Sequence, residues 1–191
     1  MQTKRKNSLD VRKMTYLAIF TAIVFVLQIL AIPVGGFFES SALPVAVIVI
    51  GTAILGIGAG AWLGFIFGVA VMILPGTQAY LTFGNNGVYS AFCTVGVVFL
   101  KGIACGAVAG LIYKLVERYN RYVAIIAAGI CAVTVNTGIF ILGSVLFFEA
   151  SFAVMMTTVV FISYPIELAV SVLLAPVALR VINIKKPSPK K

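Results

Sequence analysis

The sequence predicts an all-α integral membrane protein, a bundle of six transmembrane helices with both termini in the cytoplasm. Its composition is the first reason. Of 191 residues, 62% are apolar and 10% are charged, and the mean hydropathy is +1.15. Soluble domains contain about 45–50% apolar and about 25% charged residues. A chain of this length could not hide so much apolar surface from water, so it needs lipid as its solvent.

The distribution of basic residues is the second reason. The formal net charge is +9, and thirteen of the fourteen Lys and Arg fall in three groups, within residues 1–13, 114–121 and 180–191. This clustering leaves no basic stripe for a nucleic acid, so no nucleic-acid partner is expected. Lys and Arg concentrate in cytoplasmic segments, which places all three groups inside. The segments that then face outward contain no Lys or Arg, at about 33–43, 75–88 and 149–153.

Six apolar runs supply the spans. They lie at about 14–32, 42–55, 60–74, 89–115, 123–148 and 154–184. A helix needs about 20 residues to cross about 30 Å of hydrocarbon, so the second and third runs are short; the glycine-rich residues 56–60 predict a tight turn between them. The first run lacks a following cleavage site and is kept as a membrane helix. This divides the chain into a basic cytoplasmic N-terminus (1–13), a transmembrane domain (14–184) and a basic cytoplasmic tail (185–191).

Two ionisable residues fall at membrane depth, Lys101 in the fourth run and Glu167 in the sixth. Such a group costs at least about 2.5–3.5 kcal/mol on insertion scales, so each needs a partner or a wet cavity. The two either pair with each other or line a substrate cavity that opens outward. Asn136 and Thr137, in the middle of the fifth run, add hydrogen-bonding groups at a compatible depth.

The outer segment at residues 75–90 is rich in amides and aromatic rings and has no net charge. Gln78, Asn85, Asn86 and Tyr89 are candidates to stack on or hydrogen-bond to a small organic ligand at the mouth of a site. The alternative is that its aromatic rings form a belt at the membrane interface.

Small residues spaced four apart recur along the chain. Ala18 and Ala22 form such a pair in the first run, Gly64 and Gly68 in the third, and the fourth run repeats the spacing at Gly102, Gly106 and Gly110. Small side chains let helix backbones approach closely in lipid. Most of these pairs are expected to pack within the bundle.

Enzymatic signatures are missing from the sequence. The chain has no histidine, and its three cysteines form no CxxC pair, so no metal site, cofactor or catalytic residue is expected. It contains no Walker A sequence for binding ATP. Two rival classes stay open: a membrane enzyme that uses Lys101 or Glu167, and a self-associating channel or structural protein.

The chain resembles the substrate-binding S components of energy-coupling factor (ECF) vitamin transporters over nearly its whole length. The resemblance includes the basic N-terminus, the six spans, the Ala18–Ala22 pair and the apolar, glycine-rich stretch at 44–68. Residues 135–140 and 147–148 resemble the fifth helix of the branch that contains the pantothenate- and riboflavin-type components. The resemblance implies a non-enzymatic subunit of the bacterial cell membrane that captures a vitamin at the outer face. It also implies that Ala18 and Ala22 dock on a transmembrane coupling protein, which works with two cytoplasmic ATPases.

The charged residues at membrane depth narrow the choice of substrate. A lysine at membrane depth can neutralise a carboxylate, which favours pantothenate. A Lys101–Glu167 pair would instead favour a neutral ring system such as riboflavin. The resemblance leads one to expect a lysine near the first outer segment in a riboflavin-type protein, and residues 33–43 contain none. Pantothenate is therefore slightly favoured, with riboflavin next.

Overall fold

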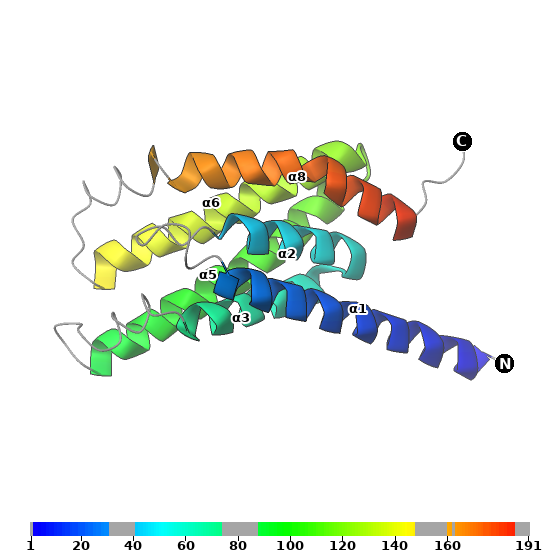
Figure 1. The fold of residues 1–191 in the computed structure, drawn as a ribbon, viewed down its shortest axis with the longest axis horizontal. Coiled ribbons are helices and arrows are strands. Elements are labelled where there is room, and N and C mark those ends of the chain that lie inside the picture. The colour runs from blue at the N-terminus through cyan, green and yellow to red at the C-terminus, as the bar shows by residue number, and fades with distance from the viewer. Residues whose placement is uncertain (1, 31–40, 74–87, 148–159, 162, 186–191) are drawn as a thin grey trace.

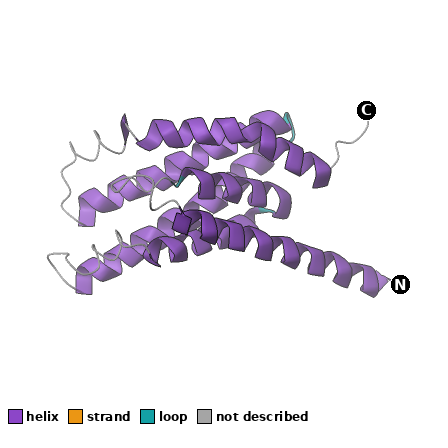
Figure 2. Cartoon of the chain, viewed as in Figure 1, coloured by secondary structure: helices purple, strands orange, loops and turns teal. Residues whose placement is uncertain are grey.

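The computed structural model describes residues 2–30, 41–73, 88–147, 160–161 and 163–185, and helix is the regular structure throughout this part of the chain (Figure 2). The six α-helices in it are α1 (Gln2–Leu30), α2 (Ala42–Leu55), α3 (Ile57–Ile73), α5 (Val88–Val116), α6 (Arg121–Phe147) and α8 (Tyr164–Lys185). Four of these contain stretches long and apolar enough to cross a membrane, whereas α2 and α3 are apolar but shorter. The predicted all-α class is confirmed.

The helices alternate in direction, so three basic parts of the chain meet at one end of the bundle. The first residues of α1, the turn between α5 and α6 and the last residues of α8 all lie at this end (Figure 1). We call it the basic end. The opposite end, where α5 and α8 begin and α6 finishes, is called the far end.

The short helix α2 occupies the centre of the bundle. It packs against all five other helices, α1, α3, α5, α6 and α8. Its 14 residues span about 21 Å at 1.5 Å per residue, which is less than the hydrocarbon thickness. A helix end is tolerated at membrane depth where protein covers it. Ser41, the residue that precedes α2, is 5% exposed, so the start of α2 is covered by protein.

Glycines bring α3 and α5 into backbone contact. A Cβ atom added at Gly64 would collide with the carbonyl oxygen of Gly102, and one added at Gly60 would lie 2.5 Å from the carbonyl oxygen of Gly106. Helices in lipid gain van der Waals contact through such close approach. The prediction that these glycines pack within the bundle is confirmed. The contact also anchors α5, the helix that carries Lys101.

Helix boundaries differ from the prediction at one turn and one terminus. The predicted turn between α2 and α3 is present but shorter than 56–60, because Gly56 alone separates the two helices, with a φ of 100°. Glycine adopts this left-handed conformation without strain, whereas Gly60 is helical and contacts α5. α1 begins at Gln2, ahead of the predicted span, because the basic segment before Met14 is rich in good helix formers.

The last helix begins regular α geometry at Tyr164, after π-helical residues at 160–161 and 163. Pro165 explains the position of the change, since it has no N–H to donate to the preceding turn and is tolerated only near a helix start. The predicted sixth span included residues 154–159, which lie outside the described residues.

At the basic end, polar contacts order the turn between α5 and α6. The side-chain oxygen of Asn120 accepts hydrogen bonds from the backbone N–H groups of Tyr122 (2.8 Å) and Val123 (3.4 Å), which caps the start of α6. Arg121 forms an ion pair with Glu117, with 3.7 Å between Nε and Oε1. This turn sets the register of α5 against α6.

Candidate functional site

A network of hydrogen bonds joins buried side chains at the start of α2, in α6 and in α8. The Ser41 hydroxyl donates to Oε1 of Glu167, and the hydroxyl of Thr137 donates to Oε2 at 3.3 Å. The amide nitrogen of Asn136 donates to the Ser41 oxygen at 3.0 Å. We call these four residues together with Lys101 the buried polar cluster; each of the five is between 4% and 8% exposed.

Glu167 also interacts with the start of α2. The backbone N–H of Ser41 donates to its Oε1 at 3.3 Å. A helix N-terminus carries a partial positive charge and unpaired N–H groups, so it favours a carboxylate. Ser41 consequently uses its hydroxyl on Glu167 and makes no side-chain cap to its own helix. Glu167 thereby joins α8 to the central helix.

Lys101 lies between two aromatic rings. Its Nζ is 5.1 Å from the ring centroid of Phe140 in α6 and 5.8 Å from that of Phe67 in α3. Both distances are within the range of cation–π attraction. The two rings therefore stabilise the buried ammonium group.

Two buried acceptor atoms have no hydrogen-bond partner among the described residues, Oδ1 of Asn136 and Oε1 of Gln28. Asn136 is 4% exposed and Gln28 is 1% exposed. A buried polar atom without a partner costs about 1–3 kcal/mol, so each is an exception that needs a reason.

The structure brings together four residues that the sequence suggested, Lys101, Asn136, Thr137 and Glu167. Sequence reasoning missed Ser41, which connects Asn136 to Glu167. A serine directly before an apolar run is a helix-start signal, and that signal could have identified it.

The predicted ligand contacts of the outer segment stay predictions. Gln78, Asn85 and Asn86 lie outside the described residues. Tyr89 belongs to α5, but its side chain lies outside the described part of the chain. Ala18 and Ala22, the proposed docking residues, both lie on the exposed face of α1.

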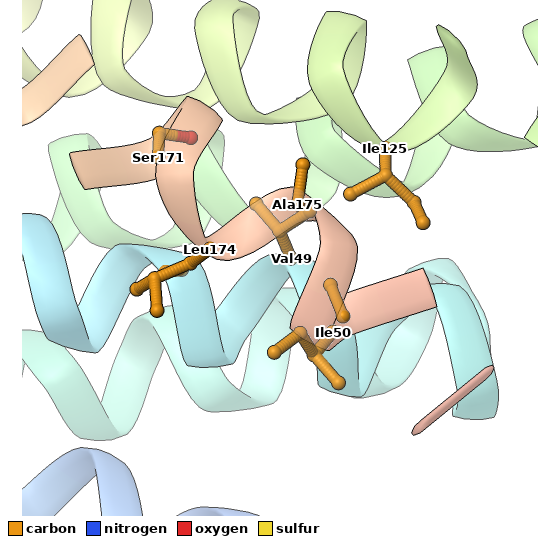
Figure 3. A pocket seen from close by; sticks show the side chains of 8 residues that line it. Val49, Ile50, Ile125, Ser171, Leu174 and Ala175 are labelled. Carbon is orange, nitrogen blue, oxygen red and sulfur yellow. The ribbon is translucent and has the colours of Figure 1, made fainter. Parts of the chain in front are cut away.

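A separate hollow lies beside α2, α6 and α8, with a cavity volume of about 10 Å³. Figure 3 shows aliphatic side chains of these helices around it, with Ser171 as the hydroxyl-bearing member. Ligand pockets usually enclose about 300–1,000 Å³ and converge several polar groups. This hollow begins one helical turn beyond Glu167 and is too small and too apolar to be the polar site.

A membrane-embedded bundle that buries an ionisable polar cluster is typical of proteins that handle a polar solute in the membrane. The family described as ECF transporter, substrate-specific component, has a model that matches residues 12–182, and the chain belongs to this family. No curated protein and no solved structure matches it. The chain is therefore a membrane-embedded, substrate-specific subunit of an ECF transporter. Membership assigns it to substrate binding and transport rather than to catalysis.

Proposed function

We propose that this subunit captures a water-soluble vitamin or vitamin precursor at the outer face of the cell membrane, with pantothenate favoured over riboflavin. The observation that carries this proposal is Lys101, a buried cation at membrane depth within the buried polar cluster. An ionisable group in that position marks a solute site by default. A carboxylate of the substrate would meet Lys101, while hydroxyl and amide groups would meet Asn136 and Thr137.

Glu167 does not depend on a direct ion pair with Lys101. Ser41 and Thr137 together donate hydrogen bonds to both of its carboxylate oxygens. Charge-assisted bonds of this kind stabilise an ionised carboxylate. This distribution supports a carboxylate-bearing substrate, because Glu167 keeps its stabilisation when Lys101 turns to the ligand.

Buried hydroxyls suggest the route to the site. Thr94 in α5 and Ser144 in α6 are 5% and 8% exposed, and each lies about two helical turns closer to the far end than Lys101 or Asn136. Thr94 and Lys101 are seven residues apart, so they share a helix face. These hydroxyls favour the far end as the side from which the substrate would enter.

The proposed topology has six spans and places both termini in the cytoplasm. The basic end gathers the start of α1, the α5–α6 turn and the end of α8, and basic segments stay inside. The far end then faces outward, which is the side from which the substrate would enter.

The partners that we propose are a transmembrane coupling protein and two cytoplasmic ATPases. Ala18 and Ala22 would form the docking surface, because both lie exposed on α1 and small side chains permit close helix approach. The ATPases would supply the energy for uptake.

The test is a binding titration of the purified full-length protein with pantothenate and with riboflavin. Lys101→Met keeps the apolar stem and removes the charge, so we expect pantothenate affinity to fall about tenfold to a hundredfold. Lys114→Met, at an exposed lysine near the basic end, is the matched control and should bind like wild type. Unchanged pantothenate affinity in Lys101→Met, or no binding of either vitamin to wild type, would contradict the proposal.

A further inference from the structure

The orientation of the Asn136 amide is set by its neighbours. The Ser41 hydroxyl has a single hydrogen, which it donates to Oε1 of Glu167. The Ser41 oxygen must then accept the bond that joins it to Asn136, 3.0 Å away. Only the NH₂ group of an amide donates, so the NH₂ group of Asn136 faces Ser41. Its carbonyl oxygen is consequently turned away from Ser41.

That carbonyl oxygen is one of the two buried side-chain atoms without a hydrogen-bond partner in the described part of the chain. The bonds from Ser41 and Thr137 keep Glu167 in place, and the bond to Ser41 keeps Asn136 in place. Rotating the amide to pair its oxygen would therefore break the bond to Ser41. The network holds a buried acceptor in position and leaves it unsatisfied.

Asn136 lies one helical turn from the aromatic ring that contacts Lys101. Phe140 follows Asn136 by four residues on α6, so the two side chains are neighbours on one face of the helix, about 5–6 Å apart at Cβ. The Nζ atom of Lys101 lies 5.1 Å from the ring of Phe140. A small molecule bound beside Lys101 along this face of α6 would lie near Asn136.

We infer that the carbonyl oxygen of Asn136 selects a substrate by accepting an N–H or O–H hydrogen bond from it, while Lys101 binds an oxygen atom of the same molecule. The substrate class is an oxygen acid or carbonyl compound with a donor a few ångströms from the acceptor group. Simple carboxylates without a donor are disfavoured, because they would leave the Asn136 oxygen buried and unpaired. This inference rests on the proposed capture function. It adds that the substrate carries a hydrogen-bond donor, which Asn136 recognises.

The test removes one hydrogen-bond donor from the ligand and one acceptor from the protein, separately and together. Wild-type protein is titrated with pantothenate and with riboflavin, each beside analogues in which one N–H or O–H group is methylated. We expect one analogue of the bound vitamin to bind about tenfold to a hundredfold more weakly than its parent. The Asn136→Leu variant should bind the unmodified vitamin only as tightly as the methylated analogue, so the difference in affinity between the two ligands disappears.

Two further variants keep the result interpretable. Asn183→Leu makes the same chemical change on the exposed end of α8 and should keep the wild-type difference between parent and analogue. Ser41→Ala removes the group that orients the amide, so the difference should shrink, and this variant carries the test where Asn136→Leu does not fold.

The possible failures are distinguishable. If no methylated analogue binds more weakly than its parent, or if the difference persists unchanged in Asn136→Leu and Ser41→Ala, the role of Asn136 is overturned while vitamin capture stands. If wild type binds neither vitamin, the proposed substrate is overturned and this inference with it.

Discussion

Two stripes of small residues, one on α3 and α5 and one on α1, look alike in the sequence and differ in the structure. Gly64 and Gly102 put the backbones of α3 and α5 in contact. Ala18 and Ala22 on α1 are four residues apart, as are Gly64 and Gly68 on α3, yet both alanines are exposed. The four-residue spacing therefore identifies a helix surface that another helix can approach closely. It does not show whether that other helix belongs to this chain, which depends on how the bundle packs.

α1 and α5 differ in the same way over their most apolar stretches. In the most apolar part of α1, 11% of the residues are buried, compared with 44% in α5. α1 packs against α2 and α3 at the edge of the bundle (Figure 1). Its outward face adds Ile19, Ile23 and Val26 to the two alanines. Within the described residues, the small residues of α5 pack against α3, whereas Ala18 and Ala22 of α1 face outward.

The largest effect on stability is expected for Gly64→Ala. The added methyl group would overlap the backbone of Gly102, which cannot rotate away, so α3 and α5 must separate. We expect a loss of about 1–3 kcal/mol in the free energy of unfolding, measured as thermal unfolding in detergent. Gly96→Ala is the control, because a Cβ atom there meets nothing within 4 Å. Equal midpoints for the two variants would show that the backbone contact is unimportant.

A smaller effect is expected for Thr21→Val, which tests how α1 is attached. The indole N–H of Trp62 in α3 donates to the Thr21 hydroxyl at 3.2 Å. Hydrogen bonds between membrane helices average about 0.6 kcal/mol, so stability should fall by roughly that amount. The same unfolding assay measures it, with Thr15→Val as the control, because the Thr15 hydroxyl donates to the backbone oxygen of Val11 within α1. A loss as large as that of Gly64→Ala would mean that α1 is integrated as firmly as α5.

The smallest effect on stability is expected for Ala18→Trp, and it separates folding from docking. The exposed position accepts a large side chain without disturbing the packing of α1. Vitamin binding and the unfolding midpoint should match wild type, whereas uptake by the assembled transporter should be abolished. Uptake is measured in cells or liposomes that contain all components. Normal uptake by this variant would refute the docking assignment.

Much of the fold could be predicted from local features. The apolar runs predicted all six described helices, and the ends of α5 and α6 were within two residues of their predicted positions. The α2–α3 turn was predicted too long because residues 56–60 contain three glycines of equal local plausibility. Gly60 is helical and lies against Gly106, and a contact between distant residues has no local signature.

The candidate site was predicted in part for a similar reason. Lys101 and Glu167 stand out because charge inside an apolar run is costly wherever the helices pack. Ser41 does not stand out, since a serine before a helix has an ordinary role as a cap. Its bonds to Glu167 and Asn136 depend on how α2 is placed among its neighbours.

The sequence by itself determined the membrane class, the helical class and the identity of the two charged residues at membrane depth, because run length and charge are local properties. Only the tertiary structure decided that Glu167 meets Ser41, 126 positions away, and that Ser41 orients Asn136, 95 positions away. It also decided which stripe of small residues the bundle buries. The physical reason is that hydrogen-bond direction and backbone contact depend on the partner's position, and packing alone sets that position.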